Sequence, residues 1–445
     1  MNYGNLLNWI GVFFMNLSEF YTHEYVTKSN AFTRKRKLDL NDVINYVLVQ
    51  KGRTNAVEAY EYVKHFKINK NKFRVSRQAI GKKRQLINPI IYFVMNKVFI
   101  YKIYEDITGL KKYKGYLLMS IDGTELKLPN KKETKEFRIK IHSLLKKALN
   151  RLKMSCVVDS YSHLIIDVLI DKKGASEVKL AIKHIKRLAK RGLNLKQTIF
   201  IADRGYNSLE LMLLFLKSDS HFVIRLKKNM FTKERNKMRT KDEFIKIGIN
   251  QKRLRNTGDL KILKIIAKTP FINLRITEII LPNGQKEILV SNLSIKKFSS
   301  EDLKEIYRCR WKIETVYDFL KNVIHIENFT GYNPIIIKQD IYTSILFYNL
   351  AMAIKIYTVD KLQKEKRLKR DYSVSFNFIA GILKIESLSI ISSKTINEKL
   401  FILKDLVEEL SYNKIKINKT KRKEIEFINS DNNNKFHMNR RIATL

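Results

Sequence analysis

Cysteine is nearly absent from this sequence of 445 residues. The two copies, Cys156 and Cys309, lie far apart and have no partners at the spacing of metal ligands, which excludes a disulfide framework and a cysteine-based zinc site. The first residues include an apolar run, but the run has no basic flank before it and falls short of the roughly 20 apolar residues that cross a bilayer. We therefore expect an intracellular protein in a reducing compartment, without a targeting signal or a membrane partner.

Glycine, proline and acidic residues are also scarce. With 15 Gly and 5 Pro, the helices and strands should be long. Only 43 Asp and Glu stand against 87 Lys and Arg, a formal net charge of +44. Such an excess repels itself unless a polyanion neutralises it, and nucleic acid is the usual polyanion. A lysine-rich codon bias also explains part of the excess, because the basic residues are spread over the whole chain.

Residues 1–112 have helical periodicity, which is clearest over 40–63 and 76–104. Near Ser76 a capping-type serine precedes small and basic residues, as in a helix that is presented to DNA. A basic helix is as often only a solvated face. The segment is therefore a weak indication of a DNA-binding region.

The pattern then changes to alternating strands and helices. Asp159 begins a hairpin-like turn between two of the strands, and Asp122 and Asp203 stand where the first and the fourth strand are expected to end. The order of the elements is that of an RNase H-like mixed sheet flanked by helices. The predicted elements are strands at 116–121, 154–158 and 164–170, a helix at 176–191, a strand at 198–202, a helix at 208–217 and a strand at 221–226.

Residues 227–295 have the pattern of further strands, so we interpret them as a β-strand insertion in the α/β domain. A turn is expected at 282–284. Helical periodicity returns at Ser300 and continues to about residue 357 through a break at 331–334. The strands expected in the insertion include 260–267, 274–281 and 286–291.

Four polar side chains share one face of the helix that follows Ser300. Tyr307, Arg310, Glu314 and Lys321 fall within an arc of roughly 60° at about 100° per residue. Taken alone, this pattern is better explained by an amphipathic helix with a surface ion pair between Arg310 and Glu314. The apolar residues of the opposite face are Ile313, Val316, Phe319, Leu320 and Val323.

The combination of Asp122, Asp203 and Glu314 favours a functional interpretation. Two aspartates on neighbouring strands and a glutamate on a helix against the same sheet would supply hard oxygen ligands for divalent cations. Two Mg²⁺ ions about 3.5–4 Å apart would activate an attacking hydroxyl and stabilise the leaving oxygen of a phosphodiester. Each aspartate also fits a plain turn, so the hypothesis depends on all three residues together.

The spacing Tyr307-x2-Arg310-x3-Glu314-x6-Lys321 resembles the Y-R-E-K signature of the bacterial DDE transposases grouped as insertion sequence four. The similarity extends from about residue 116 to residue 350. The agreeing stretches are Ile121-Asp122-Gly123-Thr124, Ala202-Asp203-Arg204-Gly205-Tyr206, Glu327-Asn328-Phe329-Thr330-Gly331 and Gln339-Asp340.

The resemblance implies an α/β, RNase H-like catalytic domain in which Asp122, Asp203 and Glu314 are the catalytic metal ligands. Two Mg²⁺ or Mn²⁺ ions would be the cofactors. The regions would be a helical N-terminal DNA-binding region (1–112), the catalytic domain in two parts (113–226 and 297–360), the β-strand insertion before the glutamate helix (227–296), and a helical C-terminal region with a basic tail (361–445).

DNA contacts are implied for Tyr307, Arg310, Lys321, Arg204 and Trp311. The guanidinium fork of arginine suits a phosphate, and lysine supplies a point charge. An indole near the active face can stack on a base, although packing is the more ordinary role for Trp311. In relatives an aromatic residue of the insertion holds a flipped base during a hairpin step. No tryptophan occurs in this insertion, which leaves Phe231 and Phe271 as candidates.

We therefore expect a DNA transposase that binds the terminal inverted repeats of its element and performs metal-dependent strand cleavage and transfer. Its partners would be double-stranded DNA at the element ends and the target, and a second copy of the chain in the end-paired complex. The location would be cytoplasmic, at the nucleoid. One alternative is a catalytically silent DNA-binding relative that inhibits transposition, and another is a structure-specific nuclease with the same sheet. The intact acidic residues count against the first, and the register of Tyr307, Arg310 and Lys321 counts against the second.

Overall fold

A computed structural model describes residues 5–34, 37–50, 52–66, 75–106, 110–139, 149–249, 270–280, 284–365 and 371–417. The chain forms two compact units. The sheet unit comprises Met1–Leu6, Thr22–Ser29 and Gln85–Ala353, and the helical unit comprises Leu7–Tyr21, Asn30–Arg84 and Ile354–Leu445.

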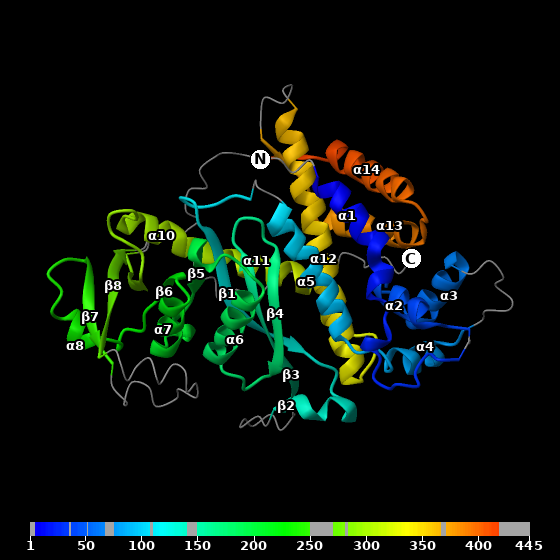
Figure 1. The fold of residues 1–445 in the computed structure, drawn as a ribbon, viewed down its shortest axis with the longest axis horizontal. Helices are drawn as coiled ribbons and strands as arrows, with labels where there is room; N and C mark the ends of the chain where they lie inside the picture. The colour runs from blue at the N-terminus through cyan, green and yellow to red at the C-terminus, as the bar shows by residue number, and fades with distance from the viewer. Residues whose placement is uncertain are drawn as a thin grey trace, which may run out of the picture. The chain divides into compact units, whose positions relative to one another are not determined.

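Helices and strands alternate through the sheet unit, whereas the helical unit is built almost wholly of helices (Figure 1). The α-helices are α1 (Leu6–Met15), α2 (Leu40–Leu48), α3 (Asn55–Phe66), α4 (Arg77–Arg84), α5 (Ile90–Asp106), α6 (Glu177–Lys190), α7 (Leu209–Lys217), α8 (Thr232–Arg235), α10 (Ser300–Arg308), α11 (Lys312–Asn322), α12 (Pro334–Lys364), α13 (Phe376–Ser392) and α14 (Ile396–Tyr412). The 3₁₀ helices used below are η5 (Arg204–Tyr206) and η7 (Cys309–Trp311). The strands are β1 (Leu117–Lys127), β2 (Arg138–Ile139), β3 (Leu149–Asp159), β4 (Ile165–Lys172), β5 (Thr198–Ala202), β6 (His221–Arg225), β7 (Asp242–Gly248), β8 (Phe271–Ile280), β9 (Lys286–Ser291), β10 (Tyr372–Ser373) and β11 (Ile415–Lys416).

One mixed sheet organises the sheet unit. Its strands follow the order β2-β3-β1-β5-β6-β9-β8-β7, and β4 also pairs with β3. β1, β5 and β6 are parallel, and the other pairs are antiparallel. The stretch β4-β3-β1-β5-β6 therefore has the predicted strand order, which is consistent with an RNase H-like sheet. The described strands of the insertion do not form a sheet of their own, because β9 pairs with β6 and extends the same sheet.

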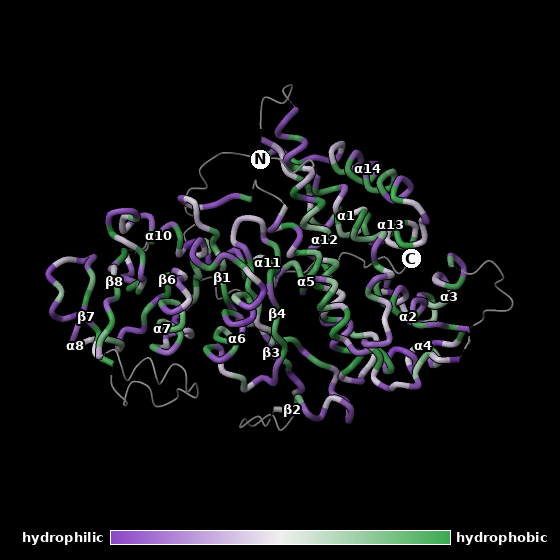
Figure 2. Tube along the Cα trace, viewed as in Figure 1, coloured by the Kyte–Doolittle hydropathy of each residue, from purple (hydrophilic) through white to green (hydrophobic). Residues whose placement is uncertain are grey.

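Both faces of this sheet are buried, because successive side chains of a strand point to opposite sides. On one face Phe200 and Phe222 stack on Phe215 of α7, with ring centroids 5.3 and 5.2 Å apart. The sequence of α7 is almost wholly apolar, and hydrophobic residues are green in Figure 2. On the other face Ile199 and Ile201 join a cluster with residues of α10. The sheet is thus held between helices on both sides, as the sequence predicts.

The first strand is longer than the sequence predicts. β1 was expected to end at Asp122, but it continues to Lys127, so this expectation is wrong. The reason is the partner strand: parallel pairing with β5 stops at Ser120, whereas antiparallel pairing with β3 continues to the end of β1. Asp122 therefore lies inside β1, just beyond the end of its parallel ladder with β5.

The long helical stretches of the sequence are interrupted in the structure. Residues 40–63 hold α2 and α3, separated by a turn in which Gly52 has a φ of +89°. Residues 76–104 hold α4 and α5, and Pro89 stands directly before the second helix. The break that the sequence predicts at 331–334 is present, since α12 begins at Pro334.

The helical N-terminal region is confirmed, and the capping box of Asp39 at the start of α2 is an example of its local order. Two of its helices, α3 and α4, contact each other within the helical unit, and α13 contacts α3. The predicted strand at 260–267, residues 282 and 283 of the predicted turn and the basic tail after residue 417 lie outside the described residues. The five-region division of the chain stays a prediction. In the part of the chain that the structure describes, no helix has both the length and the apolar character that a membrane crossing requires.

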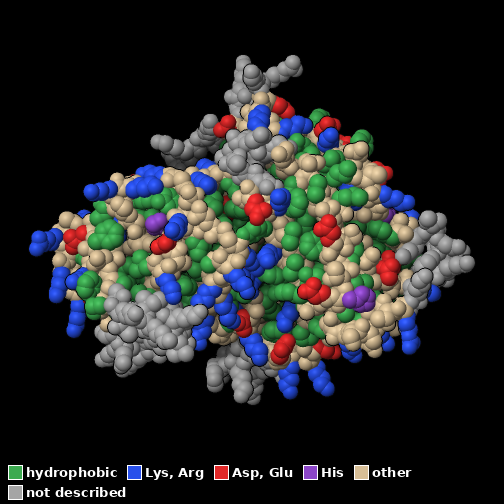
Figure 3. Space-filling view, in the orientation of Figure 1, with side chains coloured by type: hydrophobic (Ala, Val, Ile, Leu, Met, Phe, Trp, Pro, Cys, Tyr) green, Lys and Arg blue, Asp and Glu red, His purple; other side chains and the backbone are tan. Residues whose placement is uncertain are grey.

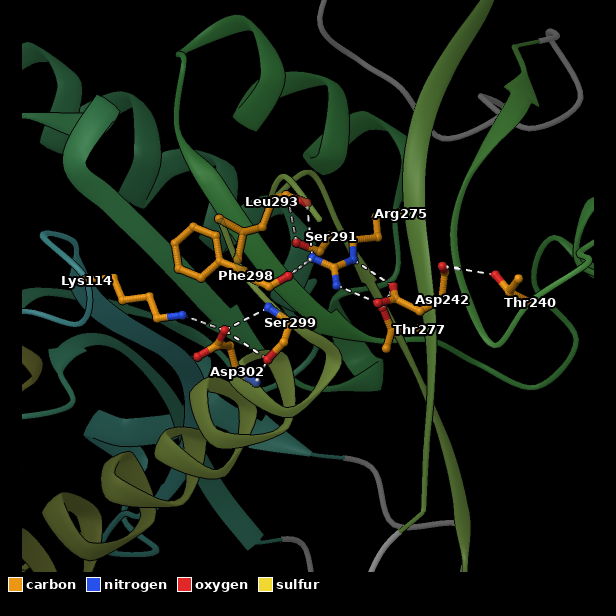
Figure 4. Close-up of polar contacts among 10 residues, drawn as sticks. All are labelled: Lys114, Thr240, Asp242, Arg275, Thr277, Ser291, Leu293, Phe298, Ser299 and Asp302. Atoms are coloured by element: carbon orange, nitrogen blue, oxygen red, sulfur yellow. Dashed lines mark hydrogen bonds and ion pairs between the residues drawn. The ribbon is translucent and has the colours of Figure 1, made fainter. Parts of the chain in front are cut away.

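A buried arginine joins the insertion to the segment that leads into α10 (Figure 4). Arg275 of β8 is fully buried and donates through Nε and Nη2 to both carboxylate oxygens of Asp242 on β7, at 2.7 and 2.6 Å. Its Nη1 donates to the carbonyl of Phe298 at 2.8 Å. Just beyond, Ser299 and Asp302 form the capping box of α10, and Lys114 donates to Asp302 at 2.6 Å. The start of the α10 and α11 segment is thereby fixed to the sheet.

We expect Arg275→Met to lower the free energy of unfolding by about 3–5 kcal/mol, because it leaves the carboxylate of Asp242 without its main partner. Urea unfolding followed by circular dichroism measures the change. Lys196→Met is a matched control, since the Lys196–Asp219 pair is 76% and 66% exposed, and it should cost less than about 0.5 kcal/mol. A loss below about 1 kcal/mol for Arg275→Met would show that this contact does not anchor the insertion.

Candidate active site

Asp122 lies in a desolvated position on β1. Its Oδ1 accepts a hydrogen bond from the Gly123 amide at 2.8 Å, and the Tyr317 hydroxyl of α11 donates to its backbone carbonyl at 2.6 Å. Burial, together with the negative charges of Asp203 and Glu177, raises the pKa of this carboxyl group to about 6. The Gly123 amide and the positive charge of Arg310 oppose that rise. The carboxyl group of Asp122 therefore lies close enough to Asp203 and Glu177 for their negative charges to act on it.

Asp203 follows the last residue of β5 and caps the short helix η5. Its Oδ1 accepts a hydrogen bond from the Gly205 amide at 2.7 Å. The carboxyl ends of the parallel strands meet at one edge of the sheet, which brings Asp203 next to the end of the parallel part of β1. The structure therefore brings Asp122 and Asp203 together, as the sequence predicts.

Glu314 approaches from the helix α11. Its Oε1 accepts a hydrogen bond from Nη1 of Arg310 at 2.8 Å, and its side chain is 43% exposed. Arg310 is 8% exposed, and its charge also acts on Asp122. The guanidinium group thus binds the glutamate and lies within the field of Asp122.

The three predicted ligands do not form a closed metal site in this arrangement. Among the residues that the structure describes, no three His, Cys, Asp or Glu side chains are placed to hold one common ion. The chemistry of the donor set nevertheless fits Mg²⁺ or Mn²⁺, which prefer carboxylate oxygens. The negative charges of Asp203 and Glu177 also act on Asp122, and a divalent cation would balance these charges. The residues present therefore fit the implied ions.

The sequence predicts one continuous helix that carries Tyr307, Arg310 and Glu314, and this prediction is wrong. The segment from Ser300 breaks into α10, the 3₁₀ turn η7 and α11, and a 3₁₀ turn advances each residue by about 120° where an α-helix advances it by about 100°. Tyr307 is consequently 6% exposed and belongs to the core cluster, with Cζ of Arg310 6.0 Å from the centre of its ring.

The other residues that the sequence predicts to contact DNA differ in their exposure and in their neighbours. Lys321 donates from Nζ to Oγ1 of Thr124 on β1 at 2.8 Å. Arg204 is exposed directly after Asp203. Trp311 is 58% exposed, so the expectation that it packs in the core is wrong, because η7 turns its indole outward. The guanidinium carbon of Arg310 lies 4.4 Å from the centre of the indole ring.

The two aromatic candidates of the insertion differ in exposure. Phe231 is 5% exposed, has a left-handed backbone with a φ of 56°, and lines a cavity of about 410 Å³. Phe271 is 38% exposed, and the ammonium group of Lys246 lies 3.5 Å from the centre of its ring. Phe231 is therefore closed to a base in this arrangement, whereas Phe271 is exposed with Lys246 over its ring.

Sequence reasoning missed two charged residues at this site. Glu177 begins α6, and its Oε1 accepts a hydrogen bond from Nζ of Lys153 on β3 at 2.7 Å. In the sequence Glu177 has the pattern of an ordinary acidic residue in a first helical turn, next to the capping Ser176. The packing of α6 against β3 places Lys153 beside it, and no local signal in the sequence marks that contact.

Residues 113–350 match the model of the family described as transposase DDE domain. This match covers more than half of the chain and agrees with the span of the resemblance, about 116–350. The chain therefore belongs to the transposase DDE domain family, a class of polynucleotidyl transferases that act in DNA transposition. The finer assignment to the insertion sequence four group stays a prediction.

The search of the curated proteins finds no match for the chain. Among solved structures, it is similar to a piggyBac transposase in a synaptic complex with hairpin DNA, with 12% identity and a TM-score of 0.45. That similarity covers 90% of this chain and 85% of the other. It is too distant to support an argument about the site.

We expect Asp122→Asn to stabilise the metal-free protein at neutral pH. Because the folded pKa is about 6, above the ordinary 3.8, the folded wild type holds the proton more tightly and loses stability as the pH rises between these values. In the presence of a chelator the variant should gain about 2–3 kcal/mol at about pH 7 and nothing below about pH 4. Urea unfolding over that pH range measures the difference. A gain that does not change with pH would contradict the desolvated position of Asp122.

Proposed function

We propose that this chain is an active DNA transposase of the insertion sequence four group, which cuts the ends of its element and joins them to new DNA. Asp122, Asp203 and Glu314 would be the catalytic residues and the ligands of two Mg²⁺ or Mn²⁺ ions. The observation that carries the proposal is the desolvated carboxylate of Asp122 beside Asp203, within the span of the DDE family match. The strand order β4-β3-β1-β5-β6 supports an RNase H-like catalytic domain.

The bound ions would activate a water or 3′ hydroxyl group for attack and stabilise the leaving oxygen. The protein itself contributes by holding the carboxylates of the site in fixed positions. Tyr317 fixes the backbone of Asp122, and the Gly205 amide orients the carboxylate of Asp203. Burial of Asp122 keeps bulk water away from that part of the site and strengthens the field of the carboxylates.

Arg310 is the residue best placed to receive a phosphate of the cleaved strand. Its Nη1 binds Glu314, and its buried Nε has no hydrogen-bond partner among the described residues. A buried donor without a partner costs free energy that a phosphate oxygen would recover. Arg310 would therefore position the scissile phosphate next to the carboxylates.

Four further side chains would contact the DNA around that phosphate. Arg204 is exposed beside Asp203, and the ammonium of Lys321 is held at Thr124, two residues from Asp122 on the same face of β1. Trp311 is exposed and lies against Arg310, so its free indole face can stack on a base. Tyr307, being buried, would act through its contact with Arg310.

The partners follow from charge and chemistry. Lys and Arg side chains are spread over the face shown in Figure 3 and outnumber the acidic ones there. This distribution suits the backbone of duplex DNA at the element ends and the target. Pairing of two ends calls for at least two copies of the chain, so we propose a homodimer in the end-paired complex.

A catalytically silent DNA-binding relative is the second candidate function. It is favoured by the ion pair that occupies Glu314 and by the lack of a closed three-residue metal site among the described residues. Such a protein would bind element ends without cutting them. A cleavage assay separates the two candidates.

We expect the wild type to cut a duplex that carries the inverted repeats flanking its gene in the presence of Mg²⁺. Glu314→Ala should slow cleavage by about 10³-fold or more, because a lost metal ligand removes several kcal/mol of transition-state stabilisation. DNA affinity, measured by fluorescence anisotropy, should be retained. Glu301→Ala is the matched control, since Glu301 lies on the neighbouring α10 and is 76% exposed, and it should leave cleavage unchanged.

Two outcomes would count against the proposal. Cleavage by Glu314→Ala at the wild-type rate would remove Glu314 from the metal site. Tight binding of the repeats by a wild type that never cuts them would establish the silent relative instead.

A further inference from the structure

Glu177 faces the same point in space as Asp203. A Cβ atom built on Gly205 would lie 2.5 Å from Oε2 of Glu177 and 2.9 Å from Oδ1 of Asp203. The distance between Oε2 of Glu177 and Oδ1 of Asp203 is therefore no greater than the sum of their two distances to that Cβ position. Because glycine has no side chain, no protein atom fills this Cβ position, which both oxygens face. Two carboxylate oxygens from different elements at such a separation suit the ligand shell of a small divalent cation.

The carboxyl group of Asp122 is close to the carboxylates of Glu177 and Asp203. Glu177 is one of the charges that raise its pKa, together with Asp203. The buried hydroxyl of Tyr206 lies within the field of all three, since burial and then the charges of Asp122, Glu177 and Asp203 raise its pKa well above the ordinary value. The charges of three carboxylates thus act on one buried phenol at the edge of the sheet.

A positive side chain is already held in this group. Nζ of Lys153 donates to Oε1 of Glu177 at 2.7 Å, and the lysine side chain is only 13% exposed. Its Cε lies 3.0 Å from the position of a Cβ on Gly123, so the chain of the lysine runs directly over the residue after Asp122. Lys153 is therefore an internal cation that is bound to Glu177 and passes over Gly123, the residue after Asp122.

The carboxylates reach the edge of the sheet from both faces. Asp122 lies on the face that α11 covers, because Thr124, two residues along β1, contacts Lys321. Glu177 comes from α6, which covers the opposite face and contacts β1 and β3. A cation at this edge would therefore be enclosed from two sides, which the set Asp122, Asp203 and Glu314 does not provide.

We propose that Glu177 is an additional ligand of the divalent-cation site, and that Lys153 serves as its internal counter-ion until a cation binds. The proposal rests on the proposed function for the presence of the ions, but it concerns a residue outside the D-D-E set. On cation binding, the ammonium of Lys153 leaves Oε1 of Glu177 and moves toward solvent. No proton or covalent bond changes in this exchange.

The test is the affinity of the full-length, DNA-free protein for Mn²⁺, measured by titration calorimetry and by the electron paramagnetic resonance of free Mn²⁺. Glu177→Gln should weaken binding about 10- to 100-fold, the range found when a residue of a metal site is lost. Lys153→Gln should strengthen it by roughly tenfold, because an ammonium no longer competes for the carboxylate. Opposite signs exclude a general loss of folding as the cause.

A neighbouring ion pair supplies matched controls. Glu125 of β1 pairs with Lys173 at 3.4 Å, and their side chains are 39% and 40% exposed. Glu125→Gln and Lys173→Gln should leave Mn²⁺ affinity unchanged. If they shift it as much as the Glu177 and Lys153 variants do, the effect is general electrostatics and the proposal is overturned.

The remaining outcomes separate this proposal from the proposed function. Loss of Mn²⁺ binding in Asp122→Asn and Asp203→Asn with unchanged binding in Glu177→Gln would overturn only the role of Glu177. Unchanged binding in Asp122→Asn and Asp203→Asn would overturn the metal site of the proposed function. Weaker binding in Glu177→Gln with tighter binding in Lys153→Gln would support the proposal.

Discussion

The repulsion between carboxylates at one desolvated edge of the sheet is the constraint on which this structure depends. Asp122 is half-buried, and the charges of Asp203 and Glu177 act on it, so the folded chain holds negative charge where water screens it less well. Among the residues that the structure describes, Arg310 and Lys153 partly balance this charge. A fold that keeps such a group unbalanced is less stable than it would otherwise be, and under the proposed function cation binding would compensate for that loss.

The surrounding architecture serves to hold these groups in place. The parallel strands β1, β5 and β6 end at a common edge, and helices on both faces deliver further side chains to it. The insertion extends the sheet and, through Arg275, fixes the entry to α10. The turn η7 then carries Arg310, which binds Glu314 and whose charge acts on Asp122. Loss of rigidity in any of these parts would move a ligand or its partner.

Much of the fold was predictable because it depends on local sequence patterns, such as apolar runs and the spacing of polar residues. Apolar runs predicted the order of the strands along the chain. The acidic blocks and the spacing around Glu314 predicted a DDE transposase, and the match over 113–350 confirms that family. Features set by distant contacts were not predictable. β1 extends past Asp122 because β3 is long enough to pair with it, and Trp311 is exposed because a 3₁₀ turn replaces a helical one. Glu177 gave no signal at all, since its environment comes from strands and turns far away in the sequence.

The most direct test of the account is the anomalous scattering of Mn²⁺ in crystals of the protein, collected with and without Mn²⁺. The account predicts an anomalous peak bounded by carboxylate oxygens of Asp122 and Asp203, with Glu177 turned from Lys153 toward the ion. A peak elsewhere on the chain, or none at Mn²⁺ concentrations that support DNA cleavage, would contradict it.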